Sequence, residues 1–221
     1  MFRTLALASV AALSLTNLSE AADFVPADDD IIAFDVIRDG RQLGTHIIRF
    51  ERNGDALRVV SDIDLRVGLG PVTLFRYEHD ATEYWEDGEL VRFESRTLKD
   101  GERLQVSAER SGDQLDIDGM NYDAEPLNVQ LPAALAVSSH WRGYSTDATA
   151  IFNTETGEAM DVVITDLGTE SLTLNNQSIT AQRFRMEGTL TVDLWYGPDG
   201  EWVKCEFEAR GETVVYNRTD A

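Results

Sequence analysis

Turn-forming dipeptides divide this sequence at regular intervals, and their spacing restricts the chain to a fold built from antiparallel strands. They are Asp39-Gly40, Asn53-Gly54, Asp87-Gly88, Asp100-Gly101, Ser111-Gly112, Asp118-Gly119, Asp199-Gly200 and Arg210-Gly211. Aspartate or asparagine followed by glycine readily adopts the positive φ angles that a tight hairpin needs. Each dipeptide therefore predicts that the runs before and after it pair as neighbouring antiparallel strands.

Apolar side chains alternate with charged ones between these turns. Leu57, Ile63 and Leu65 share one face of a run whose other face carries Asp62 and Asp64, and residues 75–86 and 190–196 follow the same rule. Such strands bury one face and expose the other. Long, twisted strands joined by tight turns curl as a sheet. The sequence therefore predicts an all-β fold, a single antiparallel meander curled into an open barrel or β-spiral.

One segment breaks this alternation. Residues 131–141 are rich in alanine and carry Pro132 near their start, which is typical of a short helix. We therefore expect one short helix near 132–140. It would divide an N-terminal meander, about 31–122, from a C-terminal one, about 146–218, and cover the mouth of the curved sheet.

The first 21 residues have the pattern of a secretory signal. Arg3 is followed by an apolar stretch from Leu5 to Leu15, and Ser19 and Ala21 are small residues at the positions that a signal peptidase reads. The stretch is too short and too polar to favour a membrane span. We expect cleavage near Ala21-Ala22, with residues 22–221 forming one domain in the bacterial periplasm. A retained anchor or a short buried helix is the alternative.

The charge of the chain restricts its partners. The formal net charge of −21 is unchanged by removal of the signal, which takes away one base and one acid. Such a chain is unsuited to nucleic acid and to anionic membrane surfaces. The single cysteine, Cys205, excludes an intrachain disulfide. It shares an alternating face with Val203 and Phe207, which indicates a buried apolar role.

An outer-membrane barrel would show the same hairpin pattern. Its strands must carry an apolar outward face with aromatic girdles. Here most strands carry aspartate, glutamate or arginine opposite the apolar side. The sequence therefore predicts a protein that is not integral to a membrane.

Motifs for catalysis and metal binding are absent from the sequence. It contains no H-x-H or H-E-x-x-H pair, no G-x-S-x-G elbow, and no phosphate or dinucleotide loop. The histidines His46, His79 and His140 are far apart in the chain. We interpret His79, on the aromatic face of residues 75–86, as a hydrogen-bonded core or rim histidine. No metal, cofactor or catalytic residue is expected.

Aromatic residues recur along the predicted strands. Curved sheets with aromatic interiors often enclose an apolar ligand, although plain core packing explains the same residues. The predicted lining of such a site is Phe75, Tyr77, His79, Trp85, Trp141 and Trp195.

Three stretches carry a resemblance to a known group of proteins. They are residues 194–204 (LWYGPDGEWVK), residues 153–157 (NTETG) and residues 34–40 (FDVIRDG). The sequence resembles an uncharacterised family of exported bacterial β-rich proteins, a domain of unknown function. That family is similar in style to β-spiral envelope proteins and to open-barrel lipoprotein carriers. The resemblance implies a curled sheet and supplies no catalytic residues.

These observations leave three functions open. The preferred one is a periplasmic, non-enzymatic binding or carrier protein for a lipid or another apolar or amphiphilic molecule. The second is a structural or interaction protein of the cell envelope that acts on another envelope protein through a sheet edge or its acidic surface. The third is a hydrolase of unknown substrate that uses His79 or His140.

Overall fold

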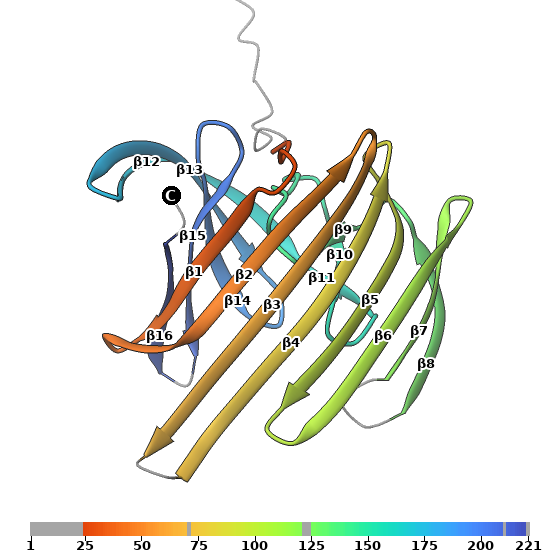
Figure 1. Ribbon diagram of the computed structural model, residues 1–221, viewed down its shortest axis with the longest axis horizontal. Helices are drawn as coiled ribbons and strands as arrows, with labels where there is room; N and C mark the ends of the chain where they lie inside the picture. The colour runs from red at the N-terminus through yellow and green to blue at the C-terminus, as the bar shows by residue number, and fades with distance from the viewer. Residues whose placement is uncertain (1–23, 70–71, 121–124, 210, 220–221) are drawn as a thin grey trace, which may run out of the picture.

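One large antiparallel sheet dominates a computed structural model that describes residues 24–69, 72–120, 125–209 and 211–219 (Figure 1). The large sheet has 13 strands, and a second sheet has three. The described residues contain no helix, so none of them forms a helix that could cross a membrane. The predicted signal, residues 1–21, lies outside the described residues.

The strands of the first half are β1 (Ile31–Arg38), β2 (Arg41–Asn53), β3 (Ala56–Leu69), β4 (Val72–Glu86), β5 (Glu89–Lys99), β6 (Glu102–Ser111), β7 (Gln114–Met120) and β8 (Pro126–Pro132). The small sheet consists of β9 (Ala136–Val137), β10 (Ala150–Phe152) and β11 (Ala159–Asp161). The second half consists of β12 (Val163–Leu174), β13 (Gln177–Glu187), β14 (Thr191–Tyr196), β15 (Trp202–Ala209) and β16 (Glu212–Arg218).

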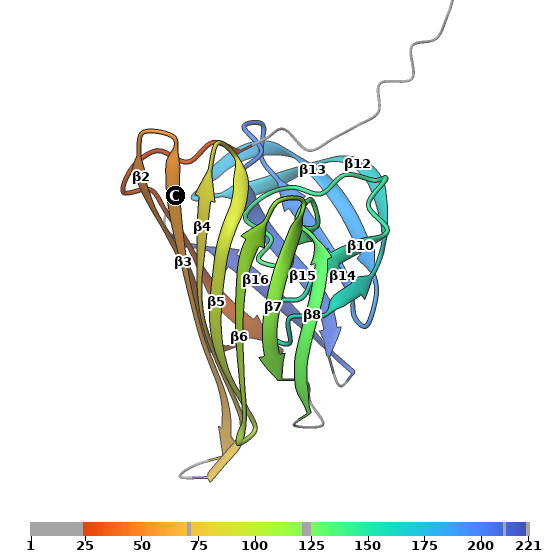
Figure 2. The same ribbon diagram turned by 90° about the vertical axis from the view of Figure 1, so that its right-hand side faces the viewer.

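The two halves join through a pairing of the first strand with the last. β16 pairs with β1, so the sheet runs in the order β12 to β16 and then β1 to β8. The sheet curls, and its end strands β12 and β8 do not pair with each other (Figures 1 and 2). The predicted all-β, open barrel-like meander is confirmed.

The segment between the halves, residues 133–162, is called the insert below. It packs against the inner face of the sheet from both sides of the curve. The ring of Phe152 lies 5.0 Å from that of Phe93 on β5, and the ring of His140 lies 5.5 Å from that of Trp202 on β15. The insert therefore fills the centre of the curled sheet. Residues 146–162 belong to it, so the C-terminal meander begins at β12 and not near 146.

The predicted helix near 132–140 is wrong. β8 ends at Pro132, a turn follows, and β9 pairs parallel with β10. The backbone N–H of Ala133 donates to the carbonyl oxygen of Asp113 at 2.9 Å, and that of Ser138 donates to Phe152 at 3.0 Å. Nucleating a helix is costly for so short a segment. Pairing with strands that are already ordered satisfies the same backbone groups without that cost.

Most turn dipeptides form the predicted hairpins, with positive φ at Asp39, Asp87 and Asp100. Asp118-Gly119 is the exception, because Gly119 lies within β7 and pairs with Leu127 of β8. A Cβ atom on Gly119 would lie 2.8 Å from the carbonyl oxygen of Thr156 in the insert. This glycine is needed for the close approach of the insert and not for a turn.

Cys205 lies on the inner face of β15 and is 3% exposed. Burial, the largest cause, raises the pKa of its thiol well above the usual range. Because the thiolate is the reactive form, we expect no reaction of the folded protein with a thiol reagent such as Ellman's reagent. One equivalent will react in concentrated guanidinium chloride. Rapid labelling of the native protein would contradict this assignment.

Candidate functional site

Buried polar side chains collect on the inner face of β2 to β5, within an otherwise apolar core. They are His46, Ser61, His79, Glu83, Ser95 and Thr97. A polar group in such surroundings is costly unless it finds a partner. The partners come partly from the insert, so this polar band joins the insert to the sheet.

Glu83 on β4 is the carboxylate at the centre of this band and is 1% exposed. Its Oε2 accepts hydrogen bonds from Nε1 of Trp85 at 2.9 Å and from Nε1 of Trp141 at 3.0 Å. Burial raises the pKa of Glu83, against hydrogen bonds from Ser139 and the two tryptophans and the charge of Arg142. One buried carboxylate thus ties Trp141 of the insert to Trp85 of the sheet.

The two tryptophans are held by packing as well as by Glu83. Their ring centroids lie 5.7 Å apart with an edge-to-face angle of 88°, and Trp141 also meets Phe50 at 5.4 Å. The Arg142 guanidinium lies 4.9 Å from the Trp85 ring centre. Because these rings pack against one another, they leave little surface for a ligand while the insert is in place.

His46 lies in the same interior, beside the ring of Trp202 at 5.5 Å. Burial, assisted by His140 and His79, lowers its pKa to about 3. Its Nε2 is 3.5 Å from Ser61 Oγ. His46 is therefore neutral at physiological pH.

The other two histidines each contact a hydroxyl group. Nδ1 of His79 lies 2.7 Å from Thr97 Oγ1, and Nδ1 of His140 lies 2.6 Å from the Tyr144 hydroxyl. Burial lowers the pKa of each to about 4, against the charge of Glu155 in the case of His79. Within the described ranges, no group of three His, Cys, Asp or Glu side chains is arranged to hold a metal ion.

The hairpin of β3 and β4 projects beyond the neighbouring strands (Figures 1 and 2). Its inner face carries an apolar surface, which we call the apolar lip, formed by the half-buried Ile63, Val67 and Phe75 and by Leu65, which is 8% exposed. Cross-strand register places Val67 opposite Phe75 and Leu65 opposite Tyr77. The lip is thus a continuous apolar strip at the end of the sheet.

Charged and polar groups border the lip where the insert ends. The Tyr77 hydroxyl donates to Glu155 Oε1 at 2.6 Å, and Lys99 Nζ lies 3.3 Å from Glu155 Oε2. The turn that carries Glu155 is fixed by Ser95 Oγ, which donates to the Thr154 carbonyl oxygen at 2.7 Å. An apolar strip next to a pair of opposite charges is complementary to an amphiphile, which has an apolar chain and a polar head group.

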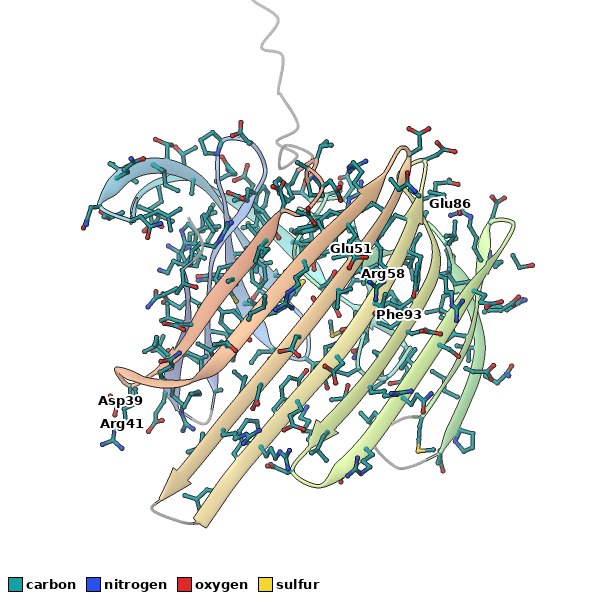
Figure 3. All side chains as sticks on the ribbon, in the orientation of Figure 1. Asp39, Arg41, Glu51, Arg58, Glu86 and Phe93 are labelled. Atoms are coloured by element: carbon teal, nitrogen blue, oxygen red, sulfur yellow. The ribbon has the colours of Figure 1, made fainter. Side chains whose placement is uncertain are left out.

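A separate depression of about 240 Å³ lies at the opposite end of β3 and β4, where Trp85 forms part of its wall. Its lining includes Glu51, Arg58 and Glu86, which are labelled in Figure 3. Its volume is below the ~300–1,000 Å³ typical of pockets for small molecules. Because the depression is small and its lining includes charged residues, it is a weaker candidate than the lip for binding an apolar ligand.

The predicted lining residues fall into three places. Phe75, Tyr77 and His79 follow one another along the inner face of β4, with the rings of Tyr77 and His79 stacked at 6.2 Å. Trp85 and Trp141 meet at Glu83, deeper in the core. The remaining residue, Trp195, lies on the outer face of the sheet. The sequence carried no signal for Glu83 or Glu155, because acidic residues are too frequent in this chain to single any out.

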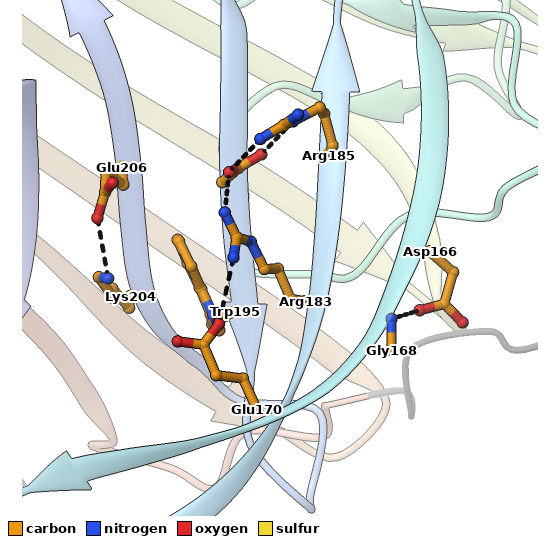
Figure 4. Close-up of polar contacts among 9 residues, drawn as sticks. Asp166, Gly168, Glu170, Arg183, Arg185, Trp195, Lys204 and Glu206 are labelled. Carbon is orange, nitrogen blue, oxygen red and sulfur yellow. Dashed lines mark hydrogen bonds and ion pairs between the residues drawn. The ribbon is translucent and has the colours of Figure 1, made fainter.

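The alternation of β14 turns Trp195 outward, into a small second cluster with Ala181 and Val203. The Arg183 guanidinium and Lys204 Nζ lie 4.7 and 4.1 Å from its ring centre, and its Nε1 donates to Glu170 at 2.9 Å (Figure 4). This network holds β12 and β13 against β14 and β15.

Asp193, beside this tryptophan, is 7% exposed and accepts hydrogen bonds from both Arg183 and Arg185. The bond from Arg185 is the largest cause of the lowered pKa of Asp193. The outer charges of these strands are therefore paired with one another, which assigns this network a structural role.

Comparison with known proteins agrees with the fold. None of the curated proteins matches the chain. Among solved structures, the chain is similar to a beta-barrel-like protein of domain of unknown function DUF1849 from Brucella abortus. The TM-score is 0.61 and the identity 8%, over 86% of this chain and 94% of that chain. Residues 34–219 match the model of DUF6134, a domain of unknown function. The predicted relation to an uncharacterised β-rich family is thereby confirmed, and the chain belongs to the DUF6134 family.

Proposed function

We propose that this protein is a non-enzymatic binding or carrier protein of the bacterial periplasm, and that it takes an apolar or amphiphilic molecule on the apolar lip. The observation that carries the proposal is the projecting β3–β4 hairpin, whose inner face is apolar, partly exposed at Ile63, Val67 and Phe75, and next to a charged pair. The secretory pattern of residues 1–21 supports export.

The size of the lip suits one acyl chain rather than a bulky ligand. The insert occupies the centre of the curled sheet, so the ligand lies along Ile63, Val67 and Phe75 at its end. Burial of apolar surface contributes about 0.8 kcal/mol per methylene group. Four or five methylenes in contact with the lip thus supply roughly 3–4 kcal/mol.

The polar border favours a head group with both signs of charge. Lys99 and Glu155 lie together beside Tyr77, so a zwitterion can offer each of them an opposite charge. The net charge of −21 disfavours anionic amphiphiles at long range. A lysophosphatidylcholine is therefore a suitable probe.

The test is a calorimetric titration of the protein with myristoyl lysophosphatidylcholine below its micelle concentration. We expect saturable binding, and we expect Phe75→Asp to weaken it by about 10-fold or more, since burying an aromatic side chain is worth about 1.5–3 kcal/mol. Ile31→Asp is the matched control, because Ile31 is 46% exposed at the start of β1, on a different strand from the lip. Its affinity should stay within about twofold of the unmodified protein, in line with the small effects of surface changes.

Two results would overturn the proposal. One is a titration without binding by the unmodified protein. The other is equal affinity of the Phe75→Asp and Ile31→Asp variants, with thermal melts confirming that both are folded. Native mass spectrometry of protein purified gently from periplasm, followed by lipid extraction, then identifies the natural ligand.

A further inference from the structure

The open sheet leaves two edges, and the two differ sharply in how they are protected. A free edge presents unpaired backbone N–H and C=O groups, which serve as a template for another strand. Soluble proteins usually block such edges with proline, lysine, bulges or short strands. In the described part of this chain, the free edges of the large sheet are β8 and β12.

The β8 edge is blocked. This strand has seven residues and is bounded by Pro126 and Pro132, which lack a backbone donor. Its Asn128 and Gln130 side chains donate to Asp118 and Asp116 of β7 at 2.8 and 2.6 Å. Only residues 127–131 lie between the two prolines, so this edge offers a short run to another strand.

The β12 edge is long and carries no such protection over its second half. The strand has 12 residues, without lysine, arginine or proline. Both of its charged residues have partners: Asp166 accepts from the N–H of Gly168 at 2.7 Å, and Glu170, whose side chain is 43% exposed, accepts from Trp195 Nε1 at 2.9 Å and pairs with Arg183 (Figure 4). A bulge at 167–168 divides the edge, which leaves Thr169 to Leu174 as one uninterrupted run.

Apart from Glu170, the exposed side chains of β12 are uncharged, in a protein that carries a net charge of −21. Val163 is 61% exposed and Leu167 is 44% exposed. The other exposed members are Thr165, Thr169, Ser171 and Thr173. Threonine and valine favour strand pairing. This edge therefore combines free backbone groups with strand-forming residues, and its exposed charge, Glu170, is paired with Arg183.

We propose that two copies of this protein pair through their β12 edges, antiparallel and about a two-fold axis near Ser171. A two-fold pair uses the same edge from both molecules and closes, whereas head-to-tail pairing would require the blocked β8 edge. Two molecules of net charge −21 repel each other, so they approach at the least cost along an edge whose exposed side chains are mostly uncharged and whose Glu170 is paired with Arg183. The pair forms one sheet across both molecules. It does not involve the apolar lip.

The first test is sedimentation or light scattering of the protein at rising concentration, at low and at high salt. We expect a dimer whose affinity increases with salt, because salt screens the repulsion between copies. Ser171→Lys should weaken the dimer at least about 10-fold, since lysine is a typical edge guard. Ser107→Lys is the matched control, because Ser107 is an exposed serine on β6, a strand paired on both sides. It should dimerise like the unmodified protein.

Single cysteines then locate the axis, since the native Cys205 is buried. Ser171→Cys should form a disulfide-linked dimer under mild oxidation, and Ser107→Cys should remain monomeric on a denaturing gel. The proposal is overturned by a protein that stays monomeric at every concentration and salt level. It is equally overturned by a dimer that Ser171→Lys leaves intact, or by equal cross-linking at both positions.

Discussion

Acidification from about pH 8 to about pH 5 will lower the free energy of unfolding by roughly 2 kcal/mol for each of His46, His79 and His140. All three are buried, and burial is the main cause that lowers their pKa values from 6.5 to about 3, 4 and 4. A native domain is stable by only about 5–15 kcal/mol. The histidines alone therefore supply an acid-driven loss comparable with the whole stability.

The sign of this effect follows from proton uptake. A histidine whose folded pKa lies below its unfolded value binds fewer protons when folded. Its contribution to stability is complete above the unfolded value of 6.5 and declines as the pH falls toward the folded value of about 3 for His46 or 4 for His79. Glu83 and Asp80 act in the opposite direction, because burial raises the pKa of each. Their protonation as the pH falls raises the free energy of unfolding and offsets part of the loss from the histidines.

A variant comparison isolates the histidine effect from these opposing groups. Urea unfolding of the unmodified protein and of His46→Leu, each at about pH 8 and pH 5, gives the loss in the free energy of unfolding on acidification for each protein. The difference between the two losses is the contribution of His46. The variant should lose about 2 kcal/mol less on acidification, and little stability at pH 8. Nδ1 of His46 has no hydrogen-bond partner among the described residues, so the substitution removes only the 3.5 Å contact of Nε2 with Ser61 Oγ. Parallel losses in both proteins would refute a neutral buried His46.

Truncation of Trp141 to alanine will destabilise the protein by about 3–5 kcal/mol, the range for large aromatic residues in a core. Trp141 is 2% exposed, packs against Phe50 and Trp85, and donates to Glu83. Its loss leaves a cavity and removes one of the two tryptophan donors that bond the buried carboxylate. Trp141→Phe keeps most of the ring but not the donor, and should cost about 1–3 kcal/mol.

Trp195→Ala is the matched control for the loss of a buried tryptophan. Trp195 is 1% exposed, but it lies on the outer face of the sheet, away from the insert. Hydrogen exchange should show faster exchange of residues 133–162 in Trp141→Ala at conditions where Trp195→Ala leaves them protected. Equal exchange of the insert in the two variants would show that Trp141 does not anchor it.

Local sequence rules identified the hairpins because each depends on only a few adjacent residues. Asp39-Gly40 and Asp87-Gly88 adopt the positive φ angles that the turns need, whatever surrounds them. Asp118-Gly119 has the same letters but lies within a strand, since its glycine admits the Thr156 carbonyl of the insert. That contact joins residues far apart in the chain, and no turn rule contains it.

The expected helix failed for a related reason. Alanine favours helices when nothing else competes, but β9 is paired by β10, which lies more than ten residues further along the chain. Tertiary pairing overrides a propensity worth only tenths of a kcal/mol per residue. Local patterns were limited in the same way for the predicted lining residues. Alternation correctly placed Phe75, Tyr77 and His79 on one face of β4. It could not place Trp141, because Trp141 lies outside the long strands.

Local patterns in the sequence were enough to predict the all-β class, the antiparallel meander and the face to which most strand residues point. These depend on turn chemistry and on a period of two, and both are local. The pairing of β16 with β1, the filling of the curve by the insert and the link from Trp85 through Glu83 to Trp141 were visible only in the folded protein. The folded protein also showed which edge remained open. Such contacts join segments distant in the chain through burial, which no short window of sequence records.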